Sequence, residues 1–274
     1  MNDAAPTTRT VIVTGAASGI GLALVNRLLD REPDTCVIAV DIAACPDERA
    51  HSLRCDLADL EAIAALDLPD HVDALANVAG VPGTAPAETV LAVNTLGLRA
   101  LTFRVLERMS GGAVVNVASI AAHRNTLGHD DIVGLLEVRD RDELRDWMDR
   151  TQLDGPAAYD TSKRAVVDWT VALSASLQPR GIRALSVSPG PTDTPILTDF
   201  EQSMGVDAIA RSASMVGRHG TAAESASVID FLLSPAAAWV NGIDVPVEGG
   251  LTAVRAAAIP IPLSRPRARV NVAE

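Results

Sequence analysis

A glycine-rich turn between a predicted strand and a predicted helix constrains the fold of this chain more than any other feature. Thr10–Thr14 is a short apolar run typical of a buried strand, and the turn Thr14–Gly21 (TGAASGIG) follows it directly. Residues 20–31 then carry apolar side chains at helical spacing. In such a turn, glycines let the backbone approach a pyrophosphate, and the N-terminus of the helix supplies free N–H donors. The alternative is a glycine turn that binds no ligand.

Asp41 favours the ligand-binding interpretation. It follows Gly21 by 20 residues and lies at the end of a predicted second strand, 36–40. A carboxylate at this position accepts hydrogen bonds from the ribose hydroxyls of a dinucleotide and repels a 2′-phosphate. No Lys or Arg lies in the glycine turn or directly after Asp41. The pattern therefore predicts NAD as the cofactor in preference to NADP.

The order of strands and helices predicts the fold class. Apolar runs alternate with amphipathic stretches at intervals typical of βαβ units. Beyond the first two strands, the pattern predicts five more strands and a long helix, at 51–55, 73–77, 113–117, 182–187, 243–247 and about 90–109. We therefore expect an α/β, doubly wound parallel sheet of the Rossmann type. No Pro/Gly/Ser-rich linker divides the chain, so residues 1–254 are expected to form one NAD-binding catalytic domain.

Two segments do not follow this alternation of strands and helices. Residues 123–157 form an insert that is rich in charge but carries an apolar stripe at helical spacing. The stripe is expected to cover the substrate cleft or a neighbouring subunit, or else to pack on its own domain. The tail, 255–274, has three prolines and no periodicity, and we expect it to be poorly ordered.

The composition argues against several other function classes. A net charge of −12, a pI near 4.8 and 3% aromatic residues disfavour binding to nucleic acid or to an anionic membrane. No run of 18 apolar residues occurs and the N-terminus does not resemble a signal peptide, so we expect a cytoplasmic protein. The three cysteines lack a CxxC pair and the five histidines lack ligand spacing. We therefore expect no metal site and reject a metal hydrolase.

The motifs along the chain closely resemble those of the short-chain dehydrogenase/reductase family. The resemblance extends over Thr10–Gly250 and rests on motifs that occur in the family's order. These are the turn TGxxxGIG, Asn77–Gly80 (NVAG, similar to NNAG), Asn94 on a helix, Ser119 with Tyr159 and Lys163, and Pro189-Gly190. In this chain 39 residues separate Ser119 from Tyr159, where most members have about a dozen. The long segment resembles the branch that contains bacterial 3α-hydroxysteroid dehydrogenases/carbonyl reductases.

Tyr159, the only tyrosine, is the candidate acid and base. Lys163 lies four residues later, so both side chains project from one face of a helix. An ammonium ~4 Å away at an effective dielectric of ~20 contributes about 4 kcal/mol, enough to lower the phenol pKa by ~3 units. We expect Tyr159 to transfer the proton of an alcohol and Ser119 to hold the same oxygen by a hydrogen bond.

The resemblance implies roles for further residues. Lys163 would also contact the ribose, Asn94 would support a proton relay, and the loop after the sixth strand would meet the nicotinamide. Asp56 would contact the adenine, although a helix N-cap is the alternative for this residue. The expected cofactor-binding residues are Gly15, Ser18, Gly19, Ile20, Gly21, Asp41, Asp56, Leu57, Asn77, Ala79, Gly80, Tyr159, Lys163, Pro189, Gly190, Thr192 and Thr194.

The expected substrate is an uncharged hydrophobic secondary alcohol or its ketone, such as a steroid, terpenoid or aryl alcohol. The segments 120–158 and 195–215 would line the cleft and carry few charges among apolar residues such as Ile120, Ile196, Leu197, Phe200 and Met204. The alternative is a non-catalytic dinucleotide-binding scaffold, which would have no need of the Ser, Tyr and Lys together. The resemblance also implies a homo-oligomer, a dimer or tetramer.

Overall fold

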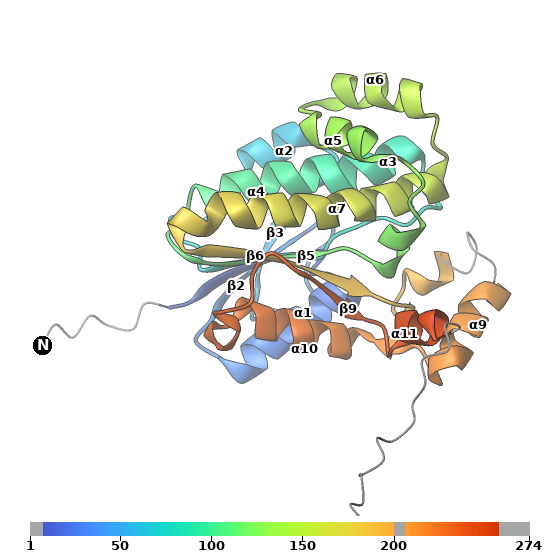
Figure 1. The fold of residues 1–274 in the computed structure, drawn as a ribbon. Helices are drawn as coiled ribbons and strands as arrows, with labels where there is room; N and C mark the ends of the chain where they lie inside the picture. The colour runs from blue at the N-terminus through green and yellow to red at the C-terminus, as the bar shows by residue number, and fades with distance from the viewer. Residues whose placement is uncertain (1–7, 200–205, 258–274) are drawn as a thin grey trace, which may run out of the picture.

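Seven parallel strands form the central sheet of the computed structural model, which describes residues 8–199 and 206–257 (Figure 1). Their order across the sheet is β3-β2-β1-β4-β5-β6-β9, and a two-stranded pair, β7-β8, lies apart from it. The sheet strands are β1 Thr10–Thr14, β2 Cys36–Asp41, β3 His51–Arg54, β4 Ala74–Asn77, β5 Gly112–Val117, β6 Ile182–Pro189 and β9 Asp244–Val247. The short pair is β7 Thr192–Asp193 and β8 Gly220–Thr221. The prediction of a doubly wound parallel sheet is confirmed.

The chain changes direction across the sheet between β1 and β4. From β1 it builds outward through β2 to β3, and from β4 it builds the other way through β5 and β6 to β9. The loops that leave the carboxyl ends of β1 and β4 therefore diverge and leave a crevice between them. Open α/β sheets bind their ligands at this point of the topology.

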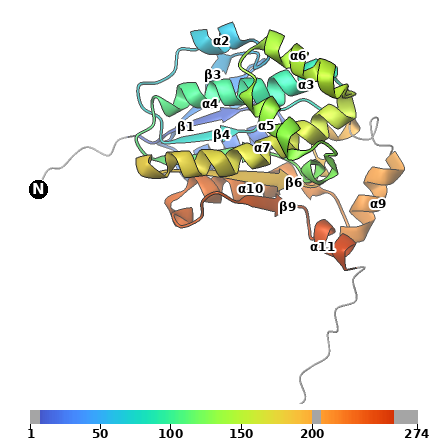
Figure 2. The ribbon, with the colours of Figure 1, turned by 45° about the horizontal axis from the view of Figure 1, so that its top comes forward.

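Helices cover both faces of the sheet (Figures 1 and 2). α1 (Gly19–Arg31) and α10 (Ala222–Leu233) lie on one face, and α4 (Leu98–Leu106) and α7 (Gly155–Leu177) lie on the other. Alternate residues of each strand contribute to the two cores. In β1, Ile12 packs toward α4 and α7, whereas Val11 and Val13 pack toward α1 and α10. Burial on both faces explains why the strands are continuous apolar runs.

The remaining helices are short and lie mainly on the α4 and α7 side or at the C-terminal end. They are α2 Leu60–Ala65, α3 Ala87–Leu91, α5 His129–Glu137, α6 Arg141–Thr151, α9 Val206–Val216 and α11 Leu251–Ala256, with 3-10 turns at Ile120–Arg124, Gln178–Arg180 and Pro235–Ala237. The tail was expected to begin at residue 255, but Arg255 and Ala256 belong to α11. Residues 258–274 lie outside the described part of the chain.

The helix expected at about 90–109 runs instead from 87 to 106 and contains a π-helical turn at Ala92–Gly97. Within the described ranges, Ala87–Leu106 is the one helical stretch long and apolar enough to cross a membrane by length and composition, with a mean hydropathy of 1.3. However, 72% of the most apolar 18-residue stretch of this helix is buried inside the domain. Its apolar character is therefore that of a core helix.

The insert folds into α5 and α6, and its last residues, 155–157, begin α7. Its apolar stripe packs on the domain itself, in a cluster shared with α3 and α7. The buried members from the insert are Ile132, Leu135, Val138, Leu144 and Trp147. Arg141 also forms an ion pair with Glu88 of α3. Of the three alternatives for the stripe, the structure favours packing on its own domain, and residues 128–152 do not line the described pockets beside Tyr159.

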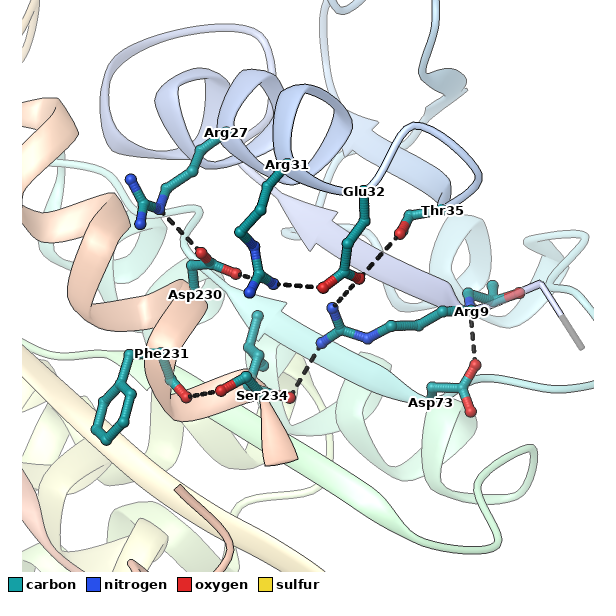
Figure 3. A network of polar contacts seen from close by, with 11 residues as sticks. Arg9, Arg27, Arg31, Glu32, Thr35, Asp73, Asp230, Phe231 and Ser234 are labelled. Atoms are coloured by element: carbon teal, nitrogen blue, oxygen red, sulfur yellow. Dashed lines mark hydrogen bonds and ion pairs between the residues drawn. The ribbon is translucent and has the colours of Figure 1, made fainter. Parts of the chain in front are cut away.

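A polar network joins α1 to α10 near the amino end of β1 (Figure 3). The Asp230 carboxylate, 3% exposed, accepts hydrogen bonds from Arg27 Nε at 2.9 Å and from Arg31 at 2.8 Å. Arg9 donates to Glu32 at 3.1 Å and to the carbonyl oxygen of Leu233 at 3.0 Å. Because this network lies at the end of β1 away from the glycine turn, its role is to hold the two helices together.

Candidate active site

The glycine turn opens onto a groove at the carboxyl ends of β1, β2, β3 and β4. The groove encloses a cavity of about 460 Å³. Its lining includes these predicted residues: Gly15, Ser18, Gly19, Ile20, Gly21, Asp41, Asp56, Leu57, Ala79 and Gly80. The structure therefore brings together groups from the carboxyl ends of four strands, β1, β2, β3 and β4.

The N-terminus of α1 suits an anionic group. Its N-cap residue, Ser18, makes no side-chain cap hydrogen bond, and the first turn contains no acidic residue. The backbone is also packed too tightly for larger residues. A Cβ on Gly21 would lie 2.0 Å from the carbonyl oxygen of Gly15, which itself has a φ of +66°. The N-terminus of α1, which has no side-chain cap, and the close-packed glycine turn together fit the pyrophosphate of a dinucleotide.

Asp41 is held at the edge of this groove by the glycine turn. One carboxylate oxygen accepts a hydrogen bond from the Ala17 N–H at 3.0 Å, and the other accepts from the Ala43 N–H at 3.1 Å. Strand pairing places Arg54 of β3 next to Asp41, and its Nε donates to the carbonyl oxygen of Ile42 at 3.1 Å. Arg54 was not predicted from the sequence, because strand pairing alone makes it a neighbour of Asp41.

Ser119, Tyr159 and Lys163 line one pocket, together with Pro189, Gly190, Thr192 and Thr194. Ser119 follows β5, whereas Tyr159 and Lys163 lie four residues apart on α7. This pocket and the glycine-turn groove share Ile20, Val78, Gly80, Thr194 and Ile196 in their linings. The two are therefore parts of one cleft, in which a dinucleotide in the groove would reach the three polar side chains.

Burial dominates the electrostatics of Tyr159. The residue is 6% exposed, and desolvation raises the pKa of its phenol to about 12. A hydrogen bond with Ser119 acts in the opposite direction and lowers this pKa, as does the positive charge of Arg124. The prediction that Lys163 lowers the Tyr159 pKa below its usual value is wrong for the protein alone. The attraction of an ammonium is outweighed here by the cost of removing a phenolate from water.

Lys163 is also buried, at 4% exposure, and its Nζ donates to the carbonyl oxygen of Val117 at 3.0 Å. The Nζ lies 5.6 Å from the centroid of the Tyr159 ring. Burial lowers the pKa of Lys163 to about 8. Lys163 therefore loses its proton at a lower pH than an exposed lysine, whereas Tyr159 keeps its proton to a higher pH than an exposed tyrosine.

We expect the stability of a Lys163→Met variant, relative to that of the wild type, to fall as the pH rises from ~7 to ~9.5. With its pKa lowered to about 8 from 10.5, the lysine binds its proton less tightly in the native state than in the unfolded state. The cost of burying the ammonium, about 3 kcal/mol, is present in full below pH ~8 and declines as the pH rises toward the unfolded pKa. In urea denaturation, the difference in the free energy of unfolding between variant and wild type should move by about 2 kcal/mol in favour of the wild type between pH ~7 and ~9.5. An equal difference at the two pH values would contradict the buried charge.

Two predicted site residues lie in the core instead of the cleft. Asn77 is 1% exposed, and its Nδ2 donates to Thr102 Oγ1 and to Asn116 Oδ1, both at 2.8 Å. Its side chain therefore faces the core, and its place among the cofactor-binding residues stays a prediction. Its motif position is explained by a buried amide that ties β4 to β5 and α4.

Asn94 lies in the π-helical turn and is fully buried. Its Oδ1 accepts from the Val81 N–H at 2.9 Å, while its Nδ2 donates to the Val81 carbonyl oxygen at 3.0 Å and to Ser162 Oγ at 3.2 Å. Asn94 thus holds the turn after Gly80 in place, and its part in a proton relay stays a prediction.

Asp56 lies in the groove, as expected, but it does not cap α2. Its Oδ1 accepts a hydrogen bond from the Ala58 N–H at 2.8 Å within the loop, and Asp59 is the N-cap. The helix N-cap alternative for Asp56 is therefore wrong. Contact with an adenine ring stays a prediction.

The sequence analysis also missed two arginines beside the catalytic pocket. Arg124, at the end of the turn after Ser119, and Arg255 of α11 line a further pocket that includes Ser119 and Tyr159. Of the expected apolar residues, Ile120 and Leu197 line this pocket and Ile196 lines the catalytic pocket. Phe200 and Met204 lie outside the described residues. Neither arginine belongs to a motif, so no signal in the sequence singled them out.

Comparison with known proteins identifies relatives over most of the chain. The family model "short chain dehydrogenase" matches residues 9–129, and the model "Enoyl-(Acyl carrier protein) reductase" matches residues 148–252. A coniferyl-alcohol dehydrogenase from Pseudomonas sp. is 34% identical over 89% of this chain and 97% of that protein. A 3α-hydroxysteroid dehydrogenase/carbonyl reductase from Comamonas testosteroni is 28% identical over 89% of this chain and 96% of that protein.

A solved structure has the same fold. The 3α-hydroxysteroid dehydrogenase from Pseudomonas sp. B-0831, complexed with NADH, superposes with a TM-score of 0.77 at 31% identity. The match covers 90% of this chain and 98% of that one. The resemblance to the hydroxysteroid dehydrogenase branch, first inferred from the long segment between Ser119 and Tyr159, is confirmed by these relatives.

Proposed function

Because the chain belongs to the short-chain dehydrogenase/reductase family of oxidoreductases, we propose that it interconverts a hydrophobic alcohol and its carbonyl compound with NAD(H). The observation that carries this proposal is the single cleft in which Ser119, Tyr159 and Lys163 adjoin a groove edged by Asp41. A scaffold that only bound a dinucleotide would need the groove and not the three polar side chains.

We propose the following roles for the side chains of the cleft. Ser119 donates a hydrogen bond to the substrate oxygen and so holds it beside the Tyr159 hydroxyl. In oxidation Tyr159 accepts the proton of the alcohol, and in reduction it returns a proton to the carbonyl oxygen. Lys163, on the same helix face, would contact the ribose. A bound nicotinamide supplies the hydride acceptor or donor and, when oxidised, a positive charge that favours the phenolate.

Asp41 supports NAD as the cofactor in preference to NADP. Backbone N–H groups donate to both of its oxygens, so the carboxylate has a fixed orientation in the lining of the groove. A 2′-phosphate at that point would meet a negative charge. The guanidinium of Arg54 lies nearby, but its Nε is bonded to the Ile42 carbonyl oxygen.

The substitution Asp41→Ala is expected to raise the KM for NAD at least about tenfold and to raise kcat/KM with NADP. The variant loses the ribose hydrogen bonds, each worth about 1 kcal/mol or more, and no longer repels the phosphate. Initial rates with both cofactors measure the change. Asp34→Ala is the matched control, because Asp34 is exposed and does not line the groove. If the ratio of kcat/KM with NAD to kcat/KM with NADP were the same in Asp41→Ala as in the wild type, this carboxylate would not determine the choice of cofactor.

The apolar lining beside Tyr159 supports a hydrophobic substrate. Ile120, Leu197 and Pro191 contribute to one pocket and Ile196 to the other. The relatives are named for coniferyl alcohol and for 3α-hydroxysteroids, both of which carry a hydroxyl group on a largely apolar body. We therefore propose a steroid, terpenoid or aryl alcohol. Assembly into a dimer or tetramer and a cytoplasmic location stay predictions.

An NADH-absorbance screen tests the proposal as a whole. Wild-type protein is assayed with NAD and with NADP over a panel of aryl, terpenoid and steroid alcohols, and with the matching carbonyl compounds in the reverse direction. We expect turnover with NAD for at least one hydrophobic class. Binding of NADH without turnover of any member would favour the scaffold alternative.

A further inference from the structure

The pocket beside Ser119 and Tyr159 has a basic wall. Its remaining walls are apolar, from Ile120 and Leu197 among others, but Arg124 and Arg255 also line it. A substrate whose oxygen is bonded to Ser119 and Tyr159 would therefore extend past guanidinium groups. Such groups are uncommon beside a site for a purely apolar molecule, because an unpaired cation loses hydration when an apolar surface covers it.

The two arginines differ in how their charge is compensated. Arg124 donates to both carboxylate oxygens of Asp160, at 2.9 and 2.6 Å, so this pair is close to neutral. Arg255 donates from one terminal nitrogen to Ser212 Oγ at 3.0 Å. Among the described residues, no carboxylate forms an ion pair with Arg255. The pocket therefore carries one uncompensated positive charge, in a chain whose net charge is −12.

An arginine with a purely structural role in this protein makes contacts that differ from those of Arg255. Arg183, for example, donates to the carbonyl oxygens of Val240, Leu232 and Ser234, and so joins the segments around it. Arg255 instead is exposed and lies near the end of α11, with one hydrogen bond that orients it beside the pocket. Its contacts leave donors of the guanidinium available to a ligand.

We propose that the substrate carries a carboxylate, remote from its reacting hydroxyl or carbonyl group, and that Arg255 binds this carboxylate. The inference rests on the proposed function and narrows its substrate class. One guanidinium matches the two oxygens of a carboxylate, whereas a phosphate dianion is usually held by more than one cation or backbone N–H group. The proposed substrate therefore has a hydrophobic body with one anionic end, and differs in this from the uncharged substrate expected from the sequence.

Two ketones of the same shape test this proposal. 4-Acetylbenzoate carries a carboxylate, whereas 4-acetylbenzamide is neutral, and both offer a methyl ketone for reduction. Dissociation constants are measured by calorimetric titration, and kcat/KM is measured with NADH. In wild-type protein we expect the acid to bind about tenfold more tightly than the amide, the size of one charge-assisted hydrogen bond. The variant Arg255→Gln should bind the two equally, and Arg255→Lys should keep part of the preference.

Arg211→Gln provides the matched control. Arg211 is exposed on α9, next to Ser212 in sequence, and does not line the pocket, so its removal tests the effect of charge at a distance. It should leave the preference for the acid within twofold of wild type. Equal binding of acid and amide by wild-type protein, or a preference that survives in Arg255→Gln, would overturn the proposal. An Arg255-dependent preference in binding without turnover of either ketone would instead count against the proposed function alone.

Discussion

Replacing Tyr159 with phenylalanine should lower kcat by about a thousandfold or more in both reaction directions. The variant keeps the aromatic ring in the buried cluster and removes only the hydroxyl, which we expect to transfer the substrate proton. Positioned acid–base catalysis contributes about 10²–10⁴ in rate, so its loss should dominate the measurement. NADH-absorbance assays at saturating substrate give kcat directly.

The binding of NADH serves as the control for Tyr159→Phe. Nicotinamide fluorescence should give a dissociation constant within about threefold of wild type, because the glycine turn and Asp41 are unchanged. The expected pattern is therefore intact binding with lost turnover. A variant that keeps more than a tenth of the wild-type kcat would sink the assignment of Tyr159 as the proton-transfer group.

The substitution Trp147→Ala should destabilise the protein by about 3–5 kcal/mol. Trp147 is 2% exposed and lies in α6 among the apolar residues that fasten the insert to α3 and α7. Its Nε1 also donates to the carbonyl oxygen of Asp131 at 3.0 Å, so the truncation removes a hydrogen bond as well as packing. Equilibrium denaturation in urea measures the loss.

Trp239→Ala is the matched control for Trp147→Ala. Trp239 follows the 3-10 turn Pro235–Ala237 and is fully exposed, at 101%. The same change of residue type should there alter the free energy of unfolding by less than about 0.5 kcal/mol. Equal effects at the two positions would mean that the insert is not anchored by its apolar stripe.

The sequence by itself determined the architecture and most of the cleft. Strands such as Thr10–Thr14 are recognisable because burial on both faces requires continuous apolar runs. Parallel strands joined by helices bring their carboxyl ends to one edge, so motifs that follow different strands must converge there. That is why the sequence alone predicts that Gly15, Asp41 and Ser119 lie around one cleft.

Only the tertiary structure decided the pKa values of buried groups and the neighbours of each side chain. The pKa of Tyr159 rises because the folded protein buries its phenol, and no spacing between residues expresses the cost of desolvation. Asn77 lies in the core and Arg255 lies at the cleft. The packing of distant segments determines the neighbours of both side chains, and their positions in the sequence do not. Local patterns report periodicity and chain geometry, whereas dielectric environment and long-range neighbours arise only when distant segments come together.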